Sequence, residues 1–203
     1  MTETWAWIGG WAIQPARIKA ALEQALPGTR HTVIHPGPQA VDQLLAAKAE
    51  RFGGYSLGSL LLLQNIHRLP EDPPPVCLAP ILGFCLEDQL GGTTPRSTLE
   101  SLRRRLAKDP AAAIRLFLRL AKLDDEPVEP LPYNLDDLDW GLETLARDTV
   151  SDPSILGHVQ AFIGKNDPLT QPHAIAAYFE RARIVPSLHS YRDLANHLNH
   201  PDN

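Results

Sequence analysis

The stretch from Arg51 to Ile66, RFGGYSLGSLLLLQNI, decides how the rest of the chain is interpreted. Residues 51–55 predict a short strand, and the apolar run 57–66 predicts a buried helix. Between them lies the GxSxG pattern of residues 54–58. A strand that runs directly into a helix holds Ser56 on a strained turn, with its hydroxyl above the sheet and the Leu57 backbone N–H pointing at the same spot. We predict Ser56 as a nucleophile and Leu57 as an oxyanion donor. The alternative is a glycine-rich turn in which Ser56 only caps a helix.

Strand and helix patterns alternate on both sides of this pattern. The strands predicted from apolar, β-prone runs are Thr4–Ile8, His31–His35, residues 51–55, Val76–Ala79, Val159–Ile163 and Ser187–Tyr191. Helical patterns separate the first four, and a helix around Ala174–Arg183 separates the last two. Such alternation predicts a mostly parallel sheet flanked by helices, an α/β fold. Residues 96–147 have only helical patterns. We therefore expect a core of residues 1–84 and 151–203, with a helical lid inserted at 85–150.

Composition narrows the function classes. The 203-residue chain has a formal net charge of −5, which argues against a nucleic-acid-binding protein. The longest aliphatic run is Leu60–Leu63, far short of a membrane-spanning helix, and the N-terminus lacks the features of a signal peptide. Two cysteines make no disulfide framework. We expect a cytoplasmic monomer without metal or cofactor.

A serine nucleophile needs a base, and the base needs an orienting acid, in the chain order Ser, acid, His. Asp167 follows the strand 159–163 and is predicted as the acid, although an aspartate before proline is also common in turns. His197 lies in the loop after the last predicted strand and is predicted as the base, with His200 as the alternative. His189 falls inside that predicted strand and is therefore set aside.

The second oxyanion donor is expected from the turn after the first strand. Gly9-Gly10-Trp11 is that turn, so the Trp11 backbone N–H is predicted to stabilise the oxyanion and its indole to wall the acyl site. The alternative is a core tryptophan after a glycine turn.

With these segments in place, the chain resembles the pimeloyl-acyl carrier protein methyl ester esterases of biotin synthesis, within the α/β-hydrolase superfamily. Residues 9–12 (GGWA) are similar to the family's HGWG turn, and residues 54–59 (GYSLGS) to its GWSLGG elbow. The other similar segments are LDWGLETL at 138–145, GKNDPLTQP at 164–172, and Ala195-Asn-His197. Phe117, in IRLFLRL, falls where the family has a lid phenylalanine.

The resemblance implies a serine carboxylesterase that hydrolyses the methyl ester of pimeloyl-acyl carrier protein through a Ser-His-Asp triad and an acyl-enzyme. It implies that Trp11, Tyr55 and Phe117 line the substrate site. Trp11 and Ser56 are only 45 positions apart, so we expect a reduced α/β-hydrolase.

A partner is suggested by charge. Residues 96–122 contain eight basic and two acidic side chains in a chain that is acidic overall. A basic lid would attract an acidic acyl carrier protein, with Arg103, Arg104, Arg115 and Arg119 as contacts. An ordinary solvated pair of helix faces explains the same charges equally well. Two other functions remain open: a broad short-chain esterase or thioesterase, and a non-catalytic hydrolase-like binding scaffold.

Overall fold

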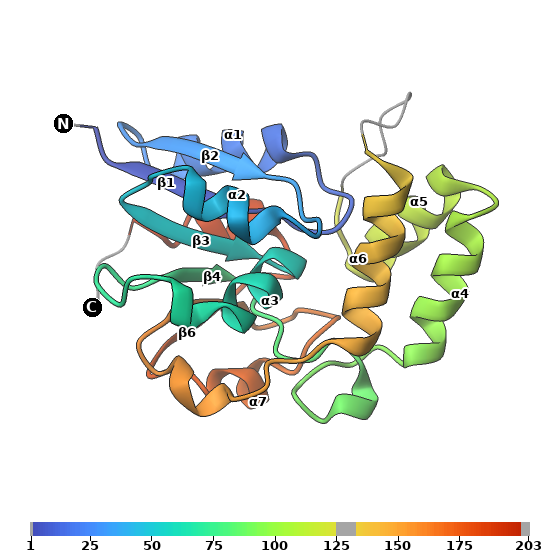
Figure 1. Cartoon of the computed structure of the whole chain (residues 1–203). Coiled ribbons are helices and arrows are strands. Elements are labelled where there is room, and N and C mark those ends of the chain that lie inside the picture. The colour runs from blue at the N-terminus through green and yellow to red at the C-terminus, as the bar shows by residue number, and fades with distance from the viewer. Residues whose placement is uncertain (1, 125–132, 200–203) are drawn as a thin grey trace.

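A computed structural model describes residues 2–124 and 133–199. Within these ranges six parallel strands form one sheet in the order β2-β1-β3-β4-β5-β6 (Figure 1). The strands are β1 (Thr4–Ile8), β2 (Arg30–Ile34), β3 (Arg51–Tyr55), β4 (Val76–Leu78), β5 (Gln160–Gly164) and β6 (Arg181–Val185). The predicted α/β class and the parallel sheet are confirmed.

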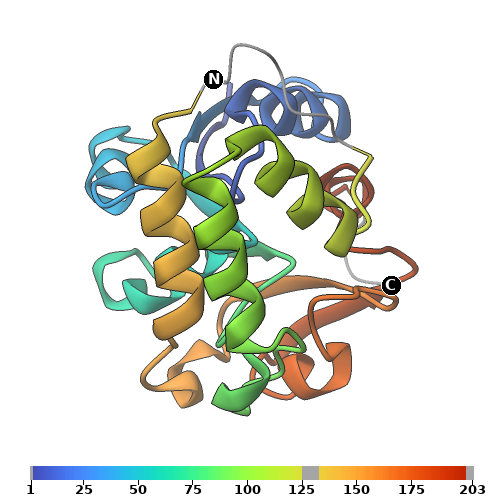
Figure 2. The ribbon, with the colours of Figure 1, turned by 90° about the vertical axis from the view of Figure 1, so that its right-hand side faces the viewer.

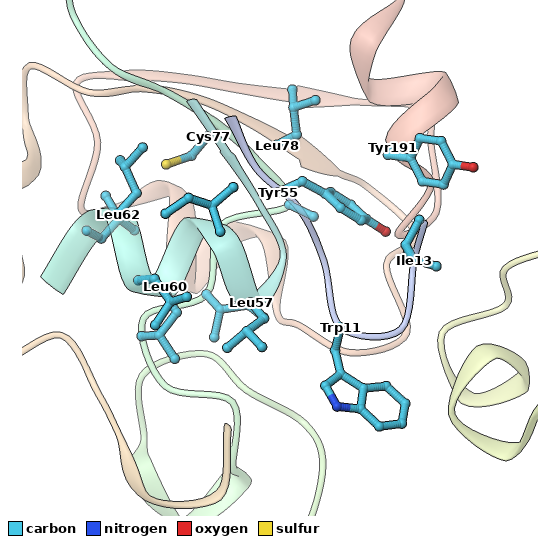
Figure 3. Packing of buried hydrophobic residues seen from close by; sticks show 14 of the residues in the cluster. Trp11, Ile13, Tyr55, Leu57, Leu60, Leu62, Cys77, Leu78 and Tyr191 are labelled. Carbon is cyan, nitrogen blue, oxygen red and sulfur yellow. The ribbon is translucent and has the colours of Figure 1, made fainter. Parts of the chain in front are cut away.

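Helices cover both faces of the sheet. Those of the core are α1 (Pro15–Ala25), α2 (Ala40–Ala46), α3 (Leu57–Gln64), α7 (Pro172–Ala176) and α8 (Tyr191–Ala195). The chain moves from β1 to β2 in one direction along the sheet and from β2 to β3 in the other. Because such crossovers are right-handed, α1 and α2 must lie on opposite faces. Accordingly α1 packs against α8, and α2 packs against α3. Helix α3 is buried along nearly its whole length, as its run of leucines predicts (Figure 3).

Three helices lie between β4 and β5 in the chain: α4 (Arg96–Leu106), α5 (Pro110–Leu120) and α6 (Leu135–Arg147). They pack together beyond the carboxyl ends of the strands, and Figure 2 shows them in front of the sheet. The two ends of this segment meet, because Gly83 and Thr149 form an antiparallel bridge and the Val150 N–H donates to the Leu82 carbonyl oxygen at 2.7 Å. The division into a core and a lid at 85–150 stays a prediction.

The predicted last strand, Ser187–Tyr191, is wrong. The strand is β6, Arg181–Val185, and α7 ends at Ala176, well before the predicted Arg183. The helix was predicted too long because the apolar residues from Ala174 onward have helical spacing. The strand was missed because an edge strand tolerates charged residues such as Arg181. Residues 187–190 therefore form the loop after the last strand.

No helix among the described residues is long and apolar enough to cross a membrane.

Candidate active site

The turn between β3 and α3 places Ser56 at the carboxyl end of the sheet. Its backbone has φ 55° and ψ −118°, a strained conformation for a residue with a side chain. A β-carbon on Gly58 would lie 2.1 Å from the Ile8 carbonyl oxygen, and one on Gly54 would lie 2.6 Å from the Gly58 carbonyl oxygen. Both glycines are therefore required by close backbone approach, as the GxSxG pattern predicts.

Ser56, His189 and Asp167 form a continuous hydrogen-bonded chain. His189 Nε2 lies 2.8 Å from Ser56 Oγ, and His189 Nδ1 lies 2.7 Å from Asp167 Oδ2. The second carboxylate oxygen of Asp167 accepts the Leu169 N–H at 2.8 Å. Since the carboxylate can only accept, the imidazole proton belongs on Nδ1, and Nε2 is left to accept from the serine hydroxyl. Ser56 is 3% exposed and His189 1%, so this chain is shielded from bulk water.

The predicted base, His197, is corrected to His189. The rule that the base follows the last strand holds, but β6 ends at Val185, so His189 is the histidine in the following loop. Helix α8 separates His197 from that loop. The alternative, His200, lies outside the described residues. The signal that could have marked the loop is Ser190, whose hydroxyl accepts the Asp193 N–H at 3.3 Å as the N-cap of α8.

The turn after β1 lies against the nucleophile, as predicted. A β-carbon on Gly10 would be 3.4 Å from Ser56 Cβ. Leu57 is the first residue of α3, and the first N–H groups of a helix have no partner within it. The turn after β1 and the start of α3 therefore both lie beside Ser56, and the Trp11 and Leu57 N–H groups stay the predicted oxyanion donors.

The Trp11 side chain joins this turn to the helical segment. Its indole N–H donates to the Leu138 carbonyl oxygen of α6 at 2.8 Å, and its ring meets Phe117 edge-on at 4.7 Å between centroids. Phe117 also stacks with Phe84 at 6.3 Å. Trp11 and Phe117 pack together and are both buried, and their role in lining the substrate site stays a prediction.

Tyr55 is buried in this structure, and its role in lining the substrate site stays a prediction. The residue is 1% exposed, and its hydroxyl donates to the His189 carbonyl oxygen at 2.7 Å. The sequence places Tyr55 one position from Ser56, and its ring lies 5.6 Å from the His189 ring.

The basic residues proposed as partner contacts divide into two groups. Arg103 faces α6, where its guanidinium contacts Asp139 at 2.6 and 2.8 Å and Glu143 at 3.3 Å. Arg103 thus joins α4 to α6, and its role as a partner contact stays a prediction. Arg104, Arg115 and Arg119 are exposed.

The two thiols do not compete with Ser56 as nucleophiles. Burial raises the pKa of Cys77 far above its usual range, and burial is also the main cause that raises the pKa of Cys85 to about 11. Thiols with such pKa values are not thiolates near neutral pH. Among the described residues, no group of three or more His, Cys, Asp and Glu side chains could hold a metal ion.

Comparison with solved structures places this arrangement in a known fold. The esterase EaEST from Exiguobacterium antarcticum superposes with a TM-score of 0.70 at 13% identity, over 93% of this chain and 84% of that chain. The RedJ thioesterase of prodiginine biosynthesis in Streptomyces coelicolor gives 0.57 at 16% identity, over 97% and 89%. The bottromycin epimerase BotH gives 0.56 at 14% identity, over 96% and 87%.

The fold is thus a reduced α/β-hydrolase fold. At these identities the likeness concerns the fold alone, and BotH illustrates that one fold accommodates different chemistry. No protein-family model matches the chain, and the search of curated proteins found no match.

Proposed function

We propose that the chain is a serine carboxylesterase. The observation that carries this proposal is the hydrogen-bonded chain from Ser56 through His189 to Asp167, with the serine on a strained strand-to-helix turn. Backbone strain of this kind costs free energy and persists where the surrounding structure enforces it, typically at functional sites.

The geometry supports an acyl-enzyme mechanism. Ser56 Oγ attacks the ester carbonyl carbon while His189 Nε2 takes the hydroxyl proton, and Asp167 stabilises the imidazolium. The N–H groups of Trp11 and Leu57 stabilise the oxyanion. His189 then donates the proton to the departing alkoxide. A water molecule that gives its proton to His189 then attacks the acyl-enzyme. His189 returns this proton to Ser56 Oγ as the acyl bond breaks, which releases the carboxylic acid product.

For the substrate, we propose the methyl ester of a pimeloyl chain on an acyl carrier protein. The sequence resemblance supports this choice. Helices α4–α6 lie over the carboxyl ends of the strands and would act as the lid.

For the partner, we propose that an acidic carrier protein docks on the outer surface of the helical segment. A groove of about 500 Å³ lies there beside the exposed side chains of Arg104, Arg105 and Lys108. Positive charge at this position would raise the encounter rate with an acidic partner and weaken in high salt.

Two other functions keep specific support. A broad esterase or thioesterase fits the same catalytic chain, and a thioesterase is among the similar structures. A binding scaffold fits the 3% exposure of Ser56, since substrate must reach this side chain for catalysis.

The test is hydrolysis of p-nitrophenyl esters and of pimeloyl-carrier protein methyl ester by wild type and Ser56→Ala. Turnover of the carrier-bound ester that is lost in the variant supports the full proposal. Turnover of small esters alone keeps the esterase and rejects the carrier-bound substrate. No turnover of either ester, with no labelling of Ser56 by a fluorophosphonate, rejects the esterase.

The docking surface is tested by Arg105→Glu/Lys108→Glu, with Arg30→Glu/Lys165→Glu as an exposed control of equal charge change. At low salt we expect KM for the carrier-bound ester to rise about tenfold only in the first pair, with small-ester turnover unchanged. Equal effects of both pairs would reject the docking surface.

A further inference from the structure

Three segments form the candidate active site: the turn after β1, the turn that holds Ser56 and the loop that carries His189. Tyr55 contacts the first and the last of them and is covalently joined to Ser56. It precedes Ser56 in the chain, and its hydroxyl donates to the His189 carbonyl oxygen at 2.7 Å. A β-carbon on Gly10, in the turn that supplies the predicted oxyanion donor, would lie 2.6 Å from Tyr55 Cε1. The phenol therefore fills the space between the oxyanion turn and the loop that carries the base.

The ring packs in a fixed position. It lies 5.6 Å from the His189 ring and 5.5 Å from the Tyr191 ring, edge-on to the latter. In Figure 3 the phenol points away from Leu60 and Leu62, toward Ile13 and Tyr191. With 1% of Tyr55 exposed, its hydroxyl is held by packing as well as by hydrogen bonding.

The loop that carries His189 is irregular, so its position depends on such contacts. Near its start, Asn166 N–H donates to the Ser187 carbonyl oxygen at 2.9 Å, which ties it to the loop of Asp167. A β-carbon on Gly164 would be 2.1 Å from the Leu188 carbonyl oxygen, so the acid and base loops are in close backbone contact. The Tyr55 hydroxyl supplies the contact at His189 itself.

We propose that Tyr55 is a positioning residue that sets the distance between His189 Nε2 and Ser56 Oγ. The inference rests on the proposed esterase activity. The nucleophile and the base are then linked twice, once by their own hydrogen bond and once through the neighbouring Tyr55 side chain and the His189 main chain. This second link acts on the base without touching substrate.

The test compares Tyr55→Phe with wild type in kcat and KM for a p-nitrophenyl ester. Removing the hydroxyl keeps the ring that packs against Gly10 and leaves the His189 carbonyl without its donor. We expect kcat to fall about tenfold with KM within twofold, because small misplacement of a catalytic group lowers the rate steeply. Tyr178→Phe, a partly buried tyrosine beyond α7, is the matched control and should keep wild-type kcat.

A double-mutant cycle separates positioning from a general structural role. In a His189→Ala background, Tyr55→Phe should not slow fluorophosphonate labelling of Ser56 further, because there is no base left to position. Circular dichroism and thermal melts show whether each variant is folded at the assay temperature.

The outcomes are distinct. An unchanged kcat in folded Tyr55→Phe, or an equal loss of labelling with and without His189, would overturn the positioning role while the esterase stands. If wild type neither hydrolyses esters nor labels on Ser56, the proposed function itself fails.

Discussion

Substitution of Gly58 by alanine should damage stability and activity together. The added β-carbon would lie 2.1 Å from the Ile8 carbonyl oxygen and 2.5 Å from the Gly9 carbonyl oxygen. A relaxed contact between carbon and oxygen is about 3.3 Å, so the start of α3 and the end of β1 must separate by about 1 Å. Overpacking of a core costs about 1–3 kcal/mol, and we expect the upper end because both obstacles are main-chain atoms. The same displacement moves the Trp11 turn away from Ser56, which should lower kcat about 100-fold.

The assay is urea unfolding together with ester hydrolysis under conditions where the variant is folded. Gly37→Ala is the control, because the atom nearest to its added β-carbon would be a carboxylate oxygen of Asp137, at an ordinary 3.4 Å. A Gly58→Ala protein within about 0.5 kcal/mol of wild type and fully active would refute the close approach and the strand-to-helix turn built on it.

Three further predictions concern the core and the helical segment. His31 accepts a hydrogen bond from the Trp7 indole at 3.1 Å, and burial lowers the pKa of His31. The contribution of neutral His31 to the free energy of unfolding should therefore be present above pH 6.5 and lost as the pH falls through the folded-state pKa. Between pH 8 and pH 5 the urea midpoint of His31→Asn should therefore fall less than that of wild type. Midpoints that fall in parallel for the two proteins would contradict this. Arg103→Ala should cost about 1 kcal/mol in urea unfolding at low salt and less at 1 M salt, since the ion pair with Asp139 is partly exposed; a salt-independent loss would argue against it. Phe117→Ala should cost about 3–5 kcal/mol by the same measurement, because it leaves a cavity beside Trp11; a loss below 1 kcal/mol would exclude tight packing there.

The parallel core could be predicted because its local signals agree. β1 and β3 were predicted with their observed bounds, since each is a short β-prone run that ends at a turn or the elbow. Helix α5 begins at Pro110, where the Asp109 side chain accepts the Ala112 N–H at 2.9 Å. Proline at the first position and an acidic cap are signals that local physics enforces.

The site was harder to predict because it depends on contacts between distant segments. Ser56 and Asp167 were identified from local turns, and the structure brings both to His189. The base was misassigned because the last strand was placed wrongly. The arginines of the edge strand β6 hide its apolar-polar alternation, so the predicted strand fell on the loop of His189 instead. The role of Tyr55 could not be predicted, since its hydroxyl meets a main-chain atom 134 positions away.

The most direct test of the central claim is fluorophosphonate labelling of wild type, Ser56→Ala, His189→Ala and His197→Ala, followed by mass mapping. Wild type and His197→Ala should label on Ser56 at equal rates, Ser56→Ala should not label, and His189→Ala should label at least about 1,000-fold more slowly. Labelling of His189→Ala at the wild-type rate, or its loss in a folded His197→Ala protein, would contradict the Ser56-His189-Asp167 assignment.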